Sequence, residues 1–187
     1  MTQTFLPPTP DEIVTLIARI GGPDAVQQVL SGALTVQLTP AHETAATAGS
    51  VPADLPFEER VARGRYGWRH EDLTEGRFPV TAEQQGDFEQ QMFHFNRNVS
   101  SEDAARLIRE AGYEPARIGE ILVYGETCPH TQSLHPVVGL GSIAEVDGKT
   151  SAPTLWFDGE RRTLDLLWLD GDWHRNYRFL GVRRPAT

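Results

Sequence analysis

Cysteine is nearly absent from this sequence of 187 residues, and no long apolar run occurs in it. The single Cys128 cannot form a disulfide within the chain or supply a cluster of thiolate metal ligands, so packing alone must hold the fold together. No stretch approaches the roughly 18 apolar residues of a membrane span, and the first residues do not form a basic and then apolar leader. We therefore expect a cytoplasmic protein without a membrane partner.

Basic residues are also scarce. The chain has 17 Lys and Arg against 26 Asp and Glu, which gives a formal net charge of -9. A protein that binds the phosphates of nucleic acid needs a basic surface, so this charge excludes nucleic acid as a partner. Hydrophobic residues make up 39% of the chain, which is enough for a packed core, so the composition predicts a globular protein rather than a disordered one.

The motifs of common catalytic and metal sites are missing as well. His130 and His135 lie in a proline-containing loop, and the sequence has no HxH or HExxH pattern. His130 follows Cys128 at the second position, but this spacing does not make a catalytic triad. The glycines of residues 139–141 are too close together for a dinucleotide-binding fingerprint. The sequence thus predicts a protein that is not an enzyme and has no cofactor and no metal site.

Residues 1–38 are predicted to form a small helix-helix-strand unit. A capping-box pattern begins the first helix at Thr9, and a second, shorter helix begins at Pro23. Alternating apolar residues predict a strand over residues 33–38. Residues 39–64 are rich in Pro, Ala and Thr with few large apolar side chains, so they are predicted to be a linker.

Residues 65–187 are predicted to form an α+β domain. The alternation of Phe93–Phe95 indicates a short strand. Ser100 precedes acidic residues and then a helical apolar period, and a second helix follows until Gly125 breaks it. After Pro136, β-prone runs separated by DGK, DGE and DGDW turns predict an antiparallel sheet.

The C-terminal segment, residues 154–184, combines a strand pattern with an unusually polar and aromatic loop. Leu164, Leu166 and Trp168 share one parity and are predicted to face the core, which places Asp165 and Leu167 on the opposite face of the strand. The loop that follows contains side chains typical of adaptable binding surfaces: Asp170, Asp172, Trp173, His174, Arg175, Asn176 and Tyr177. The same loop is equally compatible with an ordinary polar hairpin connection.

The second half of the chain resembles a known family. SSEDAARLIREAG, YEPA, RIGEILVYGE, VVGLGS and the ending LDLLWLDGDWHRNYRFLGVRR, within residues 77–184, resemble the C-type-lectin-like variable proteins of bacterial diversity-generating retroelements. The resemblance implies a C-type-lectin fold that displays hypervariable side chains near the C-terminus. It implies scaffold roles for Trp168, Trp173, Arg178 and Phe179, and display of Asp165, Leu167, Asp170, Asp172, His174, Arg175, Asn176 and Tyr177.

Two features of the wider fold are missing from this sequence. It lacks the Glu-Pro-Asn, Gln-Pro-Asp and Trp-Asn-Asp motifs of calcium-dependent lectins, so calcium and sugar binding do not carry over. It also lacks the cysteine pair on which the formylglycine-generating enzymes depend.

The leading hypothesis is a non-enzymatic module that binds a protein or other macromolecular ligand. Its predicted ligand-binding residues are Trp156, Asp165, Leu167, Asp170, Asp172, His174, Arg175, Asn176 and Tyr177. One alternative is a metal-assisted hydrolase that uses Asp170, Asp172 and His174 as a carboxylate-imidazole cluster. Another is a phage or host accessory protein in which residues 1–38 mediate assembly.

Overall fold

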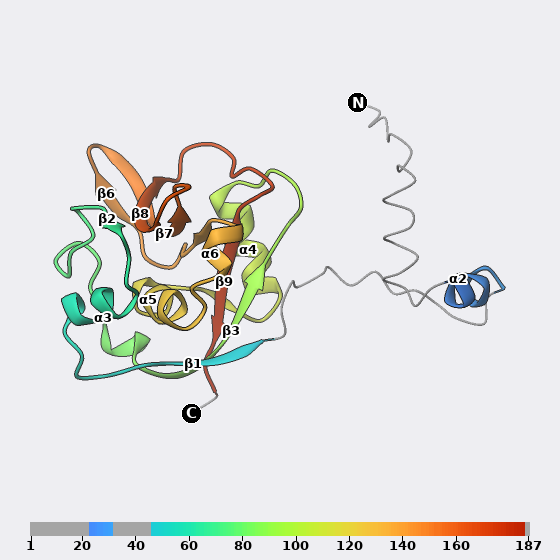
Figure 1. Cartoon of the computed structure of the whole chain (residues 1–187), viewed down its shortest axis with the longest axis horizontal. Helices are drawn as coiled ribbons and strands as arrows, with labels where there is room; N and C mark the ends of the chain where they lie inside the picture. Colours follow the sequence, from blue (N-terminus) through green and yellow to red (C-terminus); the bar gives the residue numbers. More distant parts are fainter. Residues whose placement is uncertain (1–22, 32–45, 186–187) are drawn as a thin grey trace. The chain divides into compact units, whose positions relative to one another are not determined.

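The computed structural model describes residues 23–31 and 46–185 (Figure 1). The chain divides into two units, Met1–Pro40 and Ala41–Thr187. In the first unit helix α2 spans Pro23–Leu30, which confirms the helix predicted to begin at Pro23. The predicted helix from Thr9 and the predicted strand over 33–38 lie outside the described residues.

The second unit is a mixed α+β domain, as predicted, with one large sheet and few helices. Its elements are, in chain order, β1 Thr47–Val51, α3 Phe57–Arg63, β2 Trp68–Arg69, the 3-10 helix η1 Ala82–Gln84, β3 Gly86–Phe93, α4 Ser101–Glu110, β4 Glu114–Pro115, α5 Ile118–Thr127, α6 Thr131–Leu134, β5 Val137–Val138, β6 Ala144–Val146, β7 Lys149–Phe157, β8 Arg162–Trp168 and β9 Arg178–Arg183.

The sheet has the strand order β1-β3-β9-β5-β7-β8-β2, with β4 paired to β9 and β6 paired to β7. Pairing is antiparallel except between β5 and β9 and between β2 and β8. The predicted Asp-Gly turn between β6 and β7 is present, with Asp147 and Gly148 both at positive φ, 50° and 75°. This conformation matches the twist of a tight hairpin, so a local sequence pattern determines this connection.

Two hydrophobic clusters cover opposite faces of the sheet. Met92 pairs with Leu180 in the first cluster, while the neighbouring pair of Phe93 and Phe179 belongs to the second. Successive strand residues point to opposite faces, so the clusters lie on the two sides of the sheet. The first cluster includes residues of α3 and α5, and the second includes residues of α4 together with Trp173.

The predicted linker over residues 39–64 is wrong from Thr47 onward, because β1 and α3 lie within it. Val51, Phe57 and Val61 are buried in the first cluster. The small residues of β1 suggested a linker, but Gly49 packs so closely against the ring of Phe88 that a Cβ atom would overlap it. At Gly49, the small residue therefore reflects close packing.

Helix α4 has the predicted cap, because the Ser100 hydroxyl accepts a hydrogen bond from the backbone N–H of Asp103 at 3.1 Å. Two other predictions need correction. Helix α5 continues through Gly125 to Thr127. The strand predicted at Phe93–Phe95 is instead β3, which spans Gly86–Phe93 and ends at Phe93. The side chain of Tyr66 packs directly against Gly125 and leaves no room for a Cβ atom at this position.

Candidate ligand-binding site

A cavity of about 790 Å³ lies beside β8 and the loop that joins β8 to β9; we call it the C-terminal cavity. It includes six of the nine predicted ligand-binding residues: Asp165, Leu167, Asp170, Asp172, His174 and Tyr177. The remaining lining comes from three places. Leu166, Trp168, Gly171 and Trp173 belong to β8 and its loop, Val146, Asp147, Lys149 and Ser151 belong to the hairpin of β6 and β7, and His70 is distant in the sequence.

A second, smaller cavity of about 390 Å³ adjoins it, since His174 and Tyr177 line both. Trp156 and Asn176 line this smaller cavity. Arg175 is exposed and lines neither; its backbone carbonyl lies 3.0 Å from the Nε2 atom of His94. The structure therefore brings eight of the nine predicted residues to two adjoining cavities and leaves the Arg175 side chain outside them.

The loop over residues 169–177 is held by its backbone and by one buried tryptophan. Trp173 and Val99 exchange two backbone hydrogen bonds, of 2.8 Å and 3.1 Å, and the Trp173 indole N–H donates to the Ser101 hydroxyl at 2.8 Å. The ring of Trp173 is buried and its centroid lies 5.1 Å from that of Tyr177. These contacts fix the path of the loop, while Asp170, Asp172 and His174 remain exposed.

The parity prediction for β8 is correct at two positions and wrong at one. Leu164 and Leu166 are buried, and Asp165 and Leu167 are half-buried on the other face. Trp168, predicted to be a core anchor, is 57% exposed. It is the last residue of β8, and the Nζ atom of Lys149 lies 3.1 Å from its ring centroid, so a cation covers this ring instead of a packed apolar layer.

The other residues for which the resemblance implies a scaffold role, Trp173, Arg178 and Phe179, are all buried. The buried Arg178 guanidinium donates to the backbone carbonyl of Asn176 at 3.1 Å.

Asp165 is the least exposed carboxylate of the C-terminal cavity. Burial raises its pKa, while a 2.7 Å hydrogen bond from the Leu166 backbone N–H and the nearby His70 oppose that rise. Burial also raises the pKa of the Tyr177 hydroxyl, and the Asp165 carboxylate adds to the effect. The electrostatic interactions link His70, Asp165 and Tyr177, which come from three separate segments, across one cavity.

The predicted carboxylate-imidazole cluster is not formed. In the part of the chain that the structure describes, no group of three His, Cys, Asp or Glu side chains could hold a metal ion. Asp170, Asp172 and His174 lie on one exposed loop.

His70, Asp147 and Lys149 also line the C-terminal cavity, and none of them was predicted to bind a ligand. Asp147 is the first residue of the predicted Asp-Gly turn and Lys149 follows that turn, so the turn could have placed both at the tip of a hairpin next to β8. His70 follows β2, a strand of two residues paired with β8, and no local pattern predicts that pairing.

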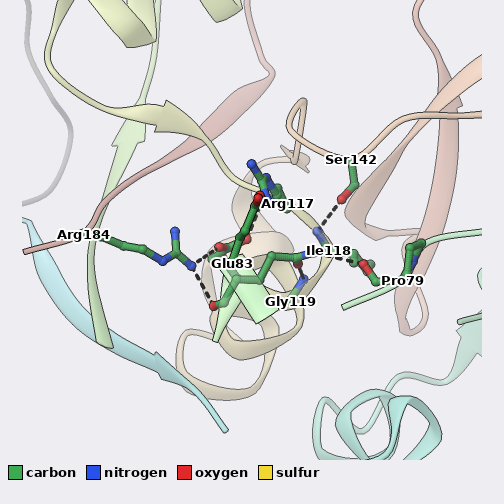
Figure 2. A network of polar contacts seen from close by, with 9 residues as sticks. Pro79, Glu83, Arg117, Ile118, Gly119, Ser142 and Arg184 are labelled. Carbon is green, nitrogen blue, oxygen red and sulfur yellow. Dashed lines mark hydrogen bonds and ion pairs between the residues drawn. The ribbon is translucent and has the colours of Figure 1, made fainter. Parts of the chain in front are cut away.

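A second cluster of polar groups lies at the start of α5, and its members are hydrogen-bonded to one another (Figure 2). The backbone N–H of Ile118 donates to the Ser142 hydroxyl at 2.9 Å, and that of Gly119 donates to the Gln84 side-chain oxygen at 2.8 Å. The backbone N–H of Arg117 donates to Glu120 at 2.8 Å. Since the donors of this helix start already have partners, the cluster caps a helix and is not a ligand site.

Among residues 23–31 and 46–185, no helix has both the length and the apolar character that crossing a bilayer requires. Comparison of the chain with protein-family models, with curated proteins and with solved structures finds no match.

Proposed function

We propose that this chain is a non-enzymatic binding module whose C-terminal cavity captures a protein or other macromolecular ligand. We also propose that its second unit is C-type-lectin-like and related to the variable proteins of diversity-generating retroelements. Helices α4 and α5, the antiparallel strands β7 and β8 that follow them, and the exposed loop before β9 support this part of the proposal. On this view, the fold provides the support and the loop provides the specificity.

The observation that carries the proposal is the composition of the cavity wall. Asp170, Asp172 and His174 are exposed on a loop that the buried Trp173 anchors, and Tyr177 adds half-buried aromatic surface beside them. Anchored loops that present polar and aromatic side chains around a hollow are typical of ligand sites. A metal-assisted hydrolase has less support, because the cluster it requires is not formed by the described residues.

A peptide-display library panned on the purified full chain tests the proposal. We expect enriched peptides that bind the wild type and lose binding to the triple variant Asp170→Ala, Asp172→Ala, His174→Ala. These side chains are exposed, so the variant should retain the thermal stability of the wild type. Enrichment of peptides that bind wild type and triple variant equally would contradict the proposal, as would no enrichment at all.

A matched control is available elsewhere on the domain. The triple variant Asp54→Ala, Asp87→Ala, His130→Ala removes the same residue types from exposed positions outside both cavities. It changes the net charge by the same amount. We expect it to bind the enriched peptides as the wild type does, which would separate a role of the cavity from an effect of overall charge.

A further inference from the structure

We infer that the C-terminal cavity takes a basic peptide segment of a partner protein, with lysine or arginine side chains entering between its carboxylates and the exposed ring of Trp168. The inference rests on the proposed function, because it names the ligand class of that same cavity. Three properties of the cavity wall lead to it: its charge, its exposed aromatic surface and the spread of its acidic groups.

The wall of the cavity is acidic. Its acidic residues are Asp147, Asp165, Asp170 and Asp172, while Lys149 is its one lysine and it has no arginine. In the described part of the chain no ion pair joins a lysine or arginine to any of these four carboxylates. Arginines do pair with carboxylates elsewhere on the domain, as in Arg183 with Glu89 at 2.8 Å.

A hollow with unpaired charges of one sign concentrates counter-ions of the other sign. The chain as a whole adds to this field, with a formal net charge of -9. A cationic ligand is therefore attracted to the cavity before it makes any contact, and an acidic ligand is repelled.

The spacing of the acidic groups favours an organic cation over a metal ion. No three His, Cys, Asp or Glu side chains among the described residues are arranged to hold a metal ion, although four carboxylates and two histidines line this cavity. Dispersed carboxylates suit several ammonium or guanidinium groups along a peptide. At about 790 Å³, the cavity is also within the range of roughly 300–1,000 Å³ that ligand sites occupy.

Trp168 provides the aromatic surface that such cations prefer. Its side chain is 57% exposed, and the ammonium group of Lys149 already lies 3.1 Å from the ring centroid. This contact within the chain demonstrates that the ring is placed to accept a cation. Lys149 is on a long flexible stem, so an incoming lysine or arginine can replace it on the ring.

Binding of a fluorescein-labelled hexa-arginine peptide to the full chain at low ionic strength, followed by fluorescence anisotropy, tests the inference. We expect the double variant Asp170→Asn, Asp172→Asn to weaken binding about tenfold, because it removes two charges that face the ligand. The control double variant Asp54→Asn, Asp87→Asn changes the net charge equally at exposed positions outside the cavity, and we expect less than about a twofold effect. Lys149→Met should strengthen binding, since it removes the competing cation.

The outcomes distinguish this inference from the proposed function. Equal weakening by the two double variants would mean that only overall charge attracts the peptide, and would overturn the inference. Equal binding of a hexa-citrulline peptide, which has the shape of hexa-arginine without its charge, would also overturn it, as would absence of hexa-arginine binding. The panning experiment does not depend on ligand charge, so it decides the proposed function separately.

Discussion

Glu120 and Arg184 form an ion pair in which the carboxylate has no exposed surface. An Arg184 guanidinium nitrogen donates to Glu120 Oε1 at 2.5 Å, and the Glu120 side chain is 0% exposed (Figure 2). The same guanidinium donates to the backbone carbonyl of Gln84 at 2.7 Å. The pair therefore fastens the residue after β9 to the first turn of α5 and to η1.

Replacing Arg184 with alanine should destabilise the domain strongly. The substitution leaves a buried carboxylate without its cation, and breaking such a pair costs about 3–5 kcal/mol. We expect a loss of about 3 kcal/mol in the free energy of unfolding, since the Arg184 side chain is 32% exposed and water can partly replace it. Urea denaturation of the two proteins measures this difference.

Arg183 is the matched control for this prediction. It pairs with Glu89 at 2.8 Å, but both side chains are substantially exposed, at 51% and 38%. Surface ion pairs contribute about 1 kcal/mol or less, so Arg183→Ala should cost far less than Arg184→Ala. Similar losses for the two variants would show that burial of Glu120 does not determine the stability of this region.

Gly125→Ala should destabilise the domain even though alanine is the better helix former. A Cβ atom at this position would overlap the hydroxyl oxygen of Tyr66. We expect a loss of about 1–3 kcal/mol from overpacking, against a gain of about 1 kcal/mol in helix propensity. Thermal or urea unfolding tests this, and Tyr66→Phe in the same chain should recover part of the loss. Gly76→Ala, where a Cβ atom meets nothing within 4 Å, should be nearly neutral.

The parts of the fold that the sequence predicts are those with a local cause. Helix α4 follows from the cap at Ser100 and its apolar period, and the hairpin of β6 and β7 follows from Asp147-Gly148. Strand β1 and the continuation of α5 past Gly125 have no such local cause. Strand β1 pairs with β3, which lies far away in the sequence. Gly49 and Gly125, which a composition argument treats as breaks, pack against Phe88 and Tyr66.

The same distinction applies to the candidate site. Most of its predicted residues belong to one loop, so identifying the loop located them together. His70 and Lys149 were missed because pairing between strands, rather than adjacency in the chain, brings them to the cavity. The error at Trp168 has a related cause: alternation predicts which face of a strand a side chain occupies, but it does not predict where the layer covering that face ends.

Replacing Trp173 with alanine should cost far more stability than replacing Trp168 with alanine. Trp173 is 6% exposed and packs in the second cluster, so Trp173→Ala should cost about 3–5 kcal/mol. Trp168 is 57% exposed and its ring contacts Lys149, so Trp168→Ala should cost less than about 1 kcal/mol. Urea denaturation provides both values. A large loss for Trp168→Ala would restore it to the scaffold role that the sequence resemblance implies.

Asp165 should make the stability of the domain depend on pH in a definite direction. Burial raises the pKa of its carboxyl group in the folded state, so the folded chain binds this proton more tightly than the unfolded chain does. The resulting contribution to stability is fully present below the unfolded pKa of about 3.9, and it is lost as the pH rises through the higher folded value.

Asp165→Asn removes this titration but keeps an oxygen that can accept the hydrogen bond from Leu166. The variant should therefore gain stability relative to the wild type as the pH rises from below about 4 to neutral. Thermal unfolding of both proteins across this range measures the difference, and a difference that is the same at every pH would show that burial does not penalise the charged form of Asp165.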